Sequence, residues 1–483
     1  MRRPLVAVPA VAGLVAVVLA TGKGLYVSPD AVFYVGTARN WLAGRGFSPP
    51  PGLPPVGHFP PLFTALLAAV GQLGLGPLTA ARAVNALSYA GVVLLVGLVV
   101  RARTSSVPAA LVASVLTAAA VDLLTYSASA LSEPLFILLA VAGLVLLATY
   151  LDRPSPARLA AAVLVVAAAF LTRYVGVALV VAGVGVLAWR RRWAAAGVFG
   201  ALTVAPVGVW LAWAGRQGPN DRSVAWHLFG AEYLGQAARP VSRWLVPWPV
   251  PPVGLVLAVV LAAGLVVLVR RRPAARSELS VLLWVFTGAY LAVLLANRAL
   301  TDATGRLDAR FLAPLHVVAV LLAVPALHRR RLPTPALVLA GVLVMGQLAD
   351  AVAWTAGGLT DAGIGRRGYS AAALRRSAAV AEVQSDVLRP LYTNAVDGLF
   401  FLTGRAVTAI PAKKDYLTGK PNPHYDEELA AMRLALAGAT QARLLYVAVP
   451  FRRSFQPTQA ELEAALPLEV VARDAVATVY RLR

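Results

Sequence analysis

The sequence predicts a polytopic α-helical membrane protein with a small external α/β domain at its C-terminus. Of its 483 residues, 59% are hydrophobic and only 14% are charged. A soluble protein of this length needs far more charge to cover its surface. Long apolar runs fill most of the chain, and basic residues gather in the gaps between them. These three observations exclude the series of soluble domains that the length alone would allow.

Eleven apolar runs have the length of about 17–25 residues that a helix needs to cross a bilayer. We expect spans over residues 4–20, 78–100, 107–125, 131–150, 156–172, 174–189, 194–214, 250–269, 279–296, 311–327 and 334–354. The fifth and sixth runs are short and meet at Arg173. The sequence therefore predicts a transmembrane bundle of about eleven helices.

The net charge of +22 comes from 44 Lys and Arg residues against 22 Asp and Glu residues, and its placement predicts the topology. Every basic cluster between the runs falls on one side of the membrane when the eleven spans alternate. Only Asp152 and Glu278 accompany these clusters, so the positive-inside rule makes this side cytoplasmic. The clusters are Arg2 and Arg3, Arg101 and Arg103, Arg153 and Arg158, Arg190 to Arg192, Arg270 to Arg272 with Arg276, and Arg329 to Arg331.

This topology signal accounts for the basic excess, and we expect no nucleic-acid partner. The strong preference for Arg over Lys is typical of a GC-rich bacterial genome. We expect a multi-pass protein of the bacterial plasma membrane, with a cytoplasmic N-terminus and an extracytoplasmic C-terminal domain.

The chain divides into a transmembrane domain, residues 1–354, and an extracytoplasmic α/β domain, residues 355–483, in which hydrophobicity falls and charge rises. An external loop, residues 21–77, joins the first two spans. In the C-terminal domain we expect strands over Val387 to Thr393 and Ala442 to Val449, helices over Tyr425 to Ala437 and Thr458 to Leu466, and a strand or hairpin over Glu469 to Leu482.

The external loop begins with a helix that runs to about residue 43. Ser28 suits the N-cap and Pro29 the first helical position. By this local interpretation Asp30 is a first-turn acid that the helix dipole favours. Apolar residues at helical spacing predict that the helix lies along the outer membrane face. These are Val35, Ala38, Trp41 and Leu42.

Short stretches with polar residues recur at the outer ends of the predicted spans. They are Asp30-Ala31-Val32-Phe33-Tyr34, His58-Phe59-Pro60-Pro61-Leu62 with Arg82, Ser132-Glu133-Pro134-Leu135, Thr172-Arg173-Tyr174 and Arg306-Leu307-Asp308-Ala309-Arg310-Phe311. In this order and on this side, they resemble the motifs of GT-C glycosyltransferases, in particular the bacterial relatives of protein O-mannosyltransferases and the lipid A aminoarabinose transferase. Residues Leu391 to Gly404, Tyr446 and Tyr480 resemble the small external domain of some bacterial members.

The resemblance implies a GT-C-like transmembrane bundle and an inverting glycosyltransferase. The donor would be a polyprenyl-phosphate sugar, and the acceptor a hydroxyl of a cell-envelope glycan, lipid or protein on the outer side. Asp30 would be the general base that takes the acceptor proton. Arginines suit the donor phosphate because a guanidinium binds it in bidentate fashion. The residues expected to bind phosphate or substrate are His58, Arg173, Arg306, Arg310, Tyr34, Glu133, Arg82 and Tyr174.

The sequence departs from the family pattern at the residues that bear on metal use. Many members have a second acid directly after the first, where this chain has Ala31. The chain also lacks cysteine, which excludes thiolate sites, and it has no ligand cluster that requires a metal. We therefore expect no metal site and no required cofactor, with arginines in place of a metal ion, while use of a divalent metal stays an alternative.

Several of these residues have structural interpretations as well. Arg82 and Arg173 can snorkel to the membrane interface. Glu133 can be the first-turn acid of a span, and Asp308 can pair with a neighbouring arginine. The alternative function is a transporter or flippase of a lipid-linked or small polar substrate, which normally needs ionisable groups at mid-membrane. The predicted spans are nearly free of charge there, which favours chemistry at the surface. A third alternative is an inactive scaffold that displays the C-terminal domain.

Overall fold

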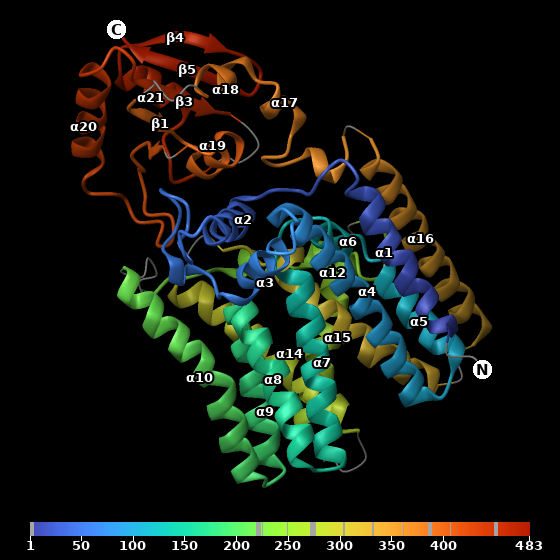
Figure 1. Ribbon diagram of the computed structural model, residues 1–483. Helices are drawn as coiled ribbons and strands as arrows, with labels where there is room; N and C mark the ends of the chain where they lie inside the picture. The colour runs from blue at the N-terminus through green and yellow to red at the C-terminus, as the bar shows by residue number, and fades with distance from the viewer. Residues whose placement is uncertain are drawn as a thin grey trace.

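The computed structural model describes residues 4–218, 224, 226–248, 250–270, 277–302, 305–330, 333–360, 362–384, 389–405, 407–448 and 453–483. Figure 1 shows long helices side by side in a bundle, with a small sheet and its helices beyond one end of it. The predicted class, a helical membrane protein with a C-terminal α/β unit, matches this arrangement.

Each of the eleven predicted runs is helical. The helices are η1 (Pro4–Ala7) with α1 (Val8–Ala20), α4 (Pro77–Thr104), α5 (Val107–Ala118) with α6 (Val121–Ser127), α7 (Glu133–Asp152), α8 (Pro156–Thr172), η3 (Tyr174–Gly176) with α9 (Val177–Trp189), α10 (Trp193–Gln217), α13 (Pro251–Arg270), α14 (Glu278–Leu300), α15 (Ala309–His328) and α16 (Thr334–Gly358). Within the described residues, six are long and apolar enough to cross a membrane, or seven if the bent pair α5 and α6 forms one span. The count of eleven spans is therefore supported only in part.

The run over residues 107–125 is not the single straight helix expected. It breaks after Ala118, and α6 continues at 58° to α5. The Tyr89 hydroxyl of α4 donates to the carbonyls of Thr117, at 3.2 Å, and Ala118, at 2.8 Å. Tyr89 thus bonds to the carbonyls at the end of α5, where the regular helical bonding stops.

The basic clusters at several helix ends lie together at one end of the bundle. Arg190, after α9, forms an ion pair with Glu278 of α14, with 3.0 Å between Nη2 and Oε1. Arg103 of α4 donates to the Ser277 hydroxyl before α14. Arg192 donates to the carbonyl of Leu151 in α7. The ends of four helices therefore meet where the alternating topology requires them to meet.

The C-terminal unit holds a five-stranded sheet of order β2-β1-β3-β5-β4. Its strands are β1 (Leu391–Thr393), β2 (Thr408–Ala409), β3 (Arg443–Val447), β4 (Leu468–Arg473) and β5 (Ala477–Leu482). β1 is parallel to β2 and β3, whereas β5 is antiparallel to β3 and β4. The helices are η5 (Ile364–Arg366), α17 (Ala372–Arg375), α18 (Ala378–Glu382), α19 (Val396–Thr403), α20 (Tyr425–Ala437) and α21 (Gln459–Ala465).

The predicted elements of this unit are present, with shorter strands. The structure has a hairpin where a strand or hairpin was expected, and α20 has the predicted bounds. Parts of two predicted strands, residues 387–388 and 449, lie outside the described residues. The two-residue strand β2 was not predicted, because so short a segment carries no periodic pattern.

The external loop folds into α2 (Pro29–Leu42), η2 (Val56–His58) and α3 (Leu62–Gly71). The expectation that the apolar face of α2 lies on the membrane is wrong for its first two members, since Val35 is 1% exposed and Ala38 is 0% exposed. They share a hydrophobic core with Leu399 and Val479 of the C-terminal unit. Protein rather than lipid covers this part of α2, while Trp41 stays 40% exposed.

The region between α10 and α14 contributes two further short helices, α11 (Ala231–Gly235) and α12 (Ala238–Ser242). Residue Arg243 follows α12 directly and bonds to side chains of α6 and α16. This segment therefore joins the bundle at the end where α7 and α15 begin.

Candidate active site

Two acids and two arginines meet at the end of the bundle opposite the basic clusters. Arg310, in the first turn of α15, forms an ion pair with Asp30 of α2, with 2.7 Å between Nη1 and Oδ2. The same guanidinium contacts Glu133 Oε1 through Nε. Arg173, between α8 and η3, contacts Glu133 Oε1 as well. The cluster thus runs Asp30, Arg310, Glu133, Arg173, and its formal charges cancel.

The local backbone explains why Asp30 reaches this cluster. The Ser28 side chain caps α2 by accepting from the N–H of Ala31, and the fixed φ of Pro29 suits the first helical position. Just before the helix, Tyr26 pairs with Ser129 in a parallel bridge. Since Glu133 follows Ser129 by four residues, this bridge brings the start of α2 next to the start of α7.

Glu133 holds the two arginines in place. Its side chain is 3% exposed, and its Oε2 atom has no hydrogen-bond partner among the described residues. Arg173 also donates to the Ser132 hydroxyl at 3.3 Å, and the buried Tyr34 hydroxyl lies 3.3 Å from the same oxygen. A buried carboxylate between two guanidinium groups fixes their orientation and leaves their other N–H groups free to point elsewhere.

Asp30 is ionised in this environment. Burial alone would raise the pKa of its carboxyl. The charge and hydrogen bond of Arg310, helped by His58 and Arg173, outweigh burial and hold the pKa below its usual value. The side chain remains 29% exposed, so a ligand can reach the carboxylate from outside. Asp30 is therefore an accessible, ionised carboxylate whose ion pair with Arg310 weakens it as a base.

Tyr34 faces the same charges from the inner side of α2. Burial raises the pKa of its hydroxyl, and the acids Asp30 and Glu133 add to this effect against Arg173. The hydroxyl thus keeps its proton and can form a hydrogen bond with Ser132. Its ring packs edge-on against Phe63, with 5.1 Å between centroids, which fixes α2 against α3.

Two residues predicted for the site lie apart from the four-residue cluster. Tyr174 donates to the carbonyl of Gly57 at 2.8 Å and accepts from Trp210 Nε1 at 3.1 Å, so it ties the external loop to α10. Arg82 donates to the Thr21 hydroxyl at 2.8 Å and to the carbonyl of Val18 at 2.6 Å. Arg82 therefore joins the outer ends of α1 and α4.

The other predicted residues lie at the rim of the cluster. The His58 ring packs edge-on against Phe59, with 4.5 Å between centroids, and its charge acts on Asp30. Arg306 is exposed and forms no ion pair or hydrogen bond within the described part of the chain. Asp308 caps α15 by accepting from the N–H groups of Arg310, at 3.0 Å, and Phe311, at 3.3 Å.

Sequence reasoning missed a second charged group at this end of the bundle. Arg243 pairs with Asp122 of α6, at 3.2 Å, and with Asp350 of α16, at 3.4 Å. The ring of Trp244 stacks on His316 of α15, with 5.3 Å between centroids. The sequence around Arg243 matches no motif, and only the packing of four helices brings these residues together.

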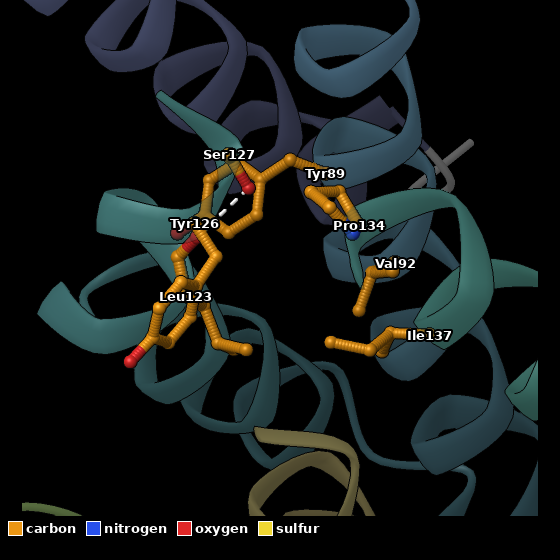
Figure 2. A pocket seen from close by; sticks show the side chains of 7 residues that line it. All are labelled: Tyr89, Val92, Leu123, Tyr126, Ser127, Pro134 and Ile137. Atoms are coloured by element: carbon orange, nitrogen blue, oxygen red, sulfur yellow. Dashed lines mark hydrogen bonds between the residues drawn. The ribbon is translucent and has the colours of Figure 1, made fainter. Parts of the chain in front are cut away.

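A small apolar pocket lies between α4, α6 and α7 (Figure 2). Its lining consists of Tyr89, Val92, Leu123, Tyr126, Ser127, Pro134 and Ile137. Apart from the two tyrosines, Ser127 is the residue of this lining that carries a hydroxyl. That hydroxyl donates to the carbonyl of Leu123 at 2.8 Å. Pro134 directly follows Glu133 in the sequence. The apolar pocket therefore lies close to the charged cluster.

The described residues contain no group of three or more His, Cys, Asp or Glu side chains that could hold a metal ion. The positive side chains that the structure places in the cluster are Arg310 and Arg173.

Two solved structures resemble this chain over nearly its whole length. The crystal structure of ArnT from Cupriavidus metallidurans bound to undecaprenyl phosphate has a TM-score of 0.60 and 14% sequence identity, and the match covers 99% of this chain and 98% of that one. The same protein in the apo state gives a TM-score of 0.59 and 16% identity, with 98% and 96% covered. No protein-family model and no curated protein sequence matches the chain. The predicted resemblance to the aminoarabinose transferase is confirmed at the level of the fold.

Proposed function

We propose that this protein is a GT-C-type glycosyltransferase that moves a sugar from a polyprenyl-phosphate donor to an acceptor hydroxyl on the extracytoplasmic side of the membrane. The observation that carries the proposal is the accessible carboxylate of Asp30 beside the guanidinium of Arg310, at one end of a helical bundle. A general base next to a phosphate-binding cation is what transfer from a sugar phosphate requires. The ArnT-like fold supports a polyprenyl-phosphate donor, since ArnT itself has been crystallised with undecaprenyl phosphate.

In the proposed reaction, Asp30 takes the proton of the acceptor hydroxyl as its oxygen attacks the anomeric carbon of the donor. The bond between this carbon and the phosphate oxygen breaks, and the polyprenyl phosphate leaves with the electron pair. A single displacement of this kind inverts the anomeric configuration. Asp30 is a weak base at pH 7 because its pKa is lowered, so its orientation contributes as much as its basicity.

Arg310 and Arg173 are the proposed ligands of the donor phosphate, with Arg306 and His58 at the rim. Glu133 fixes both guanidinium groups on one side and leaves their remaining N–H groups for the phosphate oxygens. As negative charge builds up on the leaving phosphate, these fixed donors stabilise it without rearranging. A phosphate on Arg310 would also weaken its hold on Asp30, and the pKa of the base would rise at the moment it is needed.

The proposal includes the topology. Eleven spans, a cytoplasmic N-terminus and an extracytoplasmic C-terminal domain put the Asp30 cluster on the outer side of a bacterial plasma membrane. A lipid-linked donor lies with its chain in the bilayer and its sugar at the surface, and the cluster lies where helix ends meet the external loop. The acceptor would be a glycan, lipid or protein of the cell envelope.

The test is transfer of radiolabelled sugar from polyprenyl-phosphate donors to a cell-envelope extract, by purified wild type and by Asp30→Asn. Asparagine keeps the size of the side chain and removes its basicity. We expect the variant to bind donor and to lose transfer by about 10²–10⁴-fold, the usual contribution of a general base.

The matched control is Asp350→Asn, an acid at the same end of the bundle that pairs with a different arginine. It should transfer sugar within about twofold of wild type, since the proposal gives Asp350 no role. Equal transfer by wild type and Asp30→Asn would leave Asp30 with a structural role only, as the first-turn acid of α2 that pairs with Arg310.

A further inference from the structure

The segment that leads into the helix of Asp30 lies between two other segments of the chain. On one side, Tyr26 pairs with Ser129, close to Glu133. On the other side, Val27 pairs with Gly368, which leads into the C-terminal unit. The N–H of Tyr369 donates to the carbonyl of Val27 at 2.9 Å. Three residues before Asp30, the backbone is thus bonded to the C-terminal unit.

A bond from a side chain holds the segment two residues earlier. The hydroxyl of Ser370, which is 1% exposed, donates to the carbonyl of Leu25 at 2.7 Å. Val27 itself is 0% exposed. The approach to α2 is therefore an extended segment that isolated bridges bond on both sides, with Leu25 and Val27 buried.

Tyr369 is anchored in turn by a buried ion pair. Its hydroxyl donates to Asp397 Oδ1 at 3.0 Å. Arg453 Nη2 lies 2.6 Å from both carboxylate oxygens of Asp397, whose side chain is only 4% exposed. Burial raises the pKa of Tyr369, and the Asp397 charge raises it further, so the hydroxyl keeps the proton that it donates.

The packing around this group is tight. A Cβ atom on Gly398 would meet the ring of Tyr369, so the backbone of α19 lies directly against that ring. Two residues further along α19, the ring of Phe400 lies 3.4 Å from the position a Cβ atom would take on Gly36 of α2. The C-terminal unit therefore holds α2 from its start and along its length.

We propose that the C-terminal domain positions the catalytic acid, and that Tyr369, Asp397 and Arg453 are the positioning residues through which it acts on Asp30. The inference rests on the proposed function and deepens it, because it gives the external domain a role in the transfer step. None of the three residues reaches the charged cluster directly. Their effect passes through the backbone of residues 25–28 and the first turn of α2.

The size of the expected effect follows from the demands of proton transfer. A displacement of about 1 Å at the reacting groups can cost on the order of 10²-fold in rate. Without the Asp397 charge, the Arg453 guanidinium loses its ion-pair partner and keeps its bond to the Tyr369 hydroxyl, at 3.3 Å. The local structure then shifts to solvate the guanidinium. Loss of the Asp397 charge should therefore move α2 without unfolding the transmembrane bundle.

The test uses the full-length protein and the variants Asp397→Asn and Tyr369→Phe. The matched control is Glu469→Gln, which removes an ion pair of the same domain, with Arg481 at 2.8 Å, on the exposed hairpin of β4 and β5. The first readout is hydrogen exchange of the backbone amides over residues 25–34, which needs no substrate. We expect exchange to be about tenfold faster in both variants and unchanged in the control.

The second readout is sugar transfer. We expect kcat to fall about 10–100-fold in Asp397→Asn, with the donor KM within about twofold. Combined with Asp30→Asn, the same substitution should add no further loss, because the group that it positions is already gone.

Each result decides the proposal. Unchanged exchange over residues 25–34 in both variants, or losses that multiply in the double variant, would overturn it. If Asp397→Asn does not fold, Tyr369→Phe removes a single hydroxyl and gives the same comparisons. If wild type transfers no sugar from any donor, the proposed function fails, and the exchange experiment still decides whether the domain holds the Asp30 segment.

Discussion

Arg310 contacts both acids of the site, and this one guanidinium sets the state of Asp30. Its charge and hydrogen bond outweigh the burial that would otherwise raise the pKa of the carboxyl. A lysine would supply the charge as a point and could not bond to Asp30 and Glu133 in the same fork. The side chain at position 310 therefore links the protonation of the base to the binding of the phosphate.

Replacement of Arg310 by Gln should move the acid limb of the pH–rate profile to higher pH. With Arg310 present, Asp30 stays ionised down to a pH below the ordinary aspartate pKa of about 3.9. Without it, burial dominates and the pKa rises, so the variant should lose activity as the pH falls through a range where wild type stays active. The measurement is kcat/KM against pH for both proteins. Arg243→Gln, the arginine of the second charged group, is the control and should leave the limb where it is.

The sequence predicted all four residues of the cluster but not their pairing. Asp30 and Arg310 each stand in a short polar stretch. The alternation of the spans predicts that both stretches lie at the outer side of the bundle. The bond of Glu133 to both arginines depends on how α7, α8 and α15 pack. Tyr174 belongs to the same stretch as Arg173, yet it bonds to Gly57 and Trp210, and no pattern in the sequence distinguishes the two neighbours.

At the level of single elements, the sequence predicted a helix well where the residues that set its ends lie within the helix itself. α20 has the expected bounds because its apolar positions and its first-turn acids are local features. The break between α5 and α6 has its stabilising group in another helix, Tyr89 of α4. The residues that bend do not themselves predict such a break. The sequence therefore predicted one span over residues 107–125.

Two glycines of α9 give a prediction about helix packing with its own control. A Cβ atom on Gly183 would meet the ring of Phe199 in α10 and lie 3.0 Å from Leu147 in α7. Gly185 has open space around it within the described structure. Gly183→Ala should therefore destabilise the protein by about 1–3 kcal/mol through overpacking. Gly185→Ala should be neutral or stabilise by up to about 1 kcal/mol through helix propensity.

Thermal unfolding of both variants in detergent measures this difference. A lower unfolding temperature for Gly183→Ala alone would show that α7 and α10 leave no room for a methyl group at Gly183 of α9. Equal midpoints would mean that the three helices have room to separate.

For the whole molecule, composition and the apolar runs were enough to predict the class, because a bilayer imposes one length and one polarity on every span. The shared core of the external loop and the C-terminal unit was beyond the sequence. Val27 and Val479 lie at opposite ends of the chain, and each reads as an ordinary apolar residue. Long-range contacts between loops follow from the packing of the complete chain, which no local pattern encodes.

The sidedness of the molecule is the prediction on which the proposed function most depends, and the absence of cysteine makes it easy to measure. Ala464→Cys lies on the exposed face of α21 in the C-terminal unit, and Ala157→Cys is exposed at the start of α8, near the basic end of the bundle. A membrane-impermeant maleimide should label Ala464→Cys in intact spheroplasts. It should label Ala157→Cys only after the membrane is opened, since the positive-inside rule puts that end in the cytoplasm. The opposite pattern would place the Asp30 cluster inside the cell, where a donor displayed on the outer surface could not reach it.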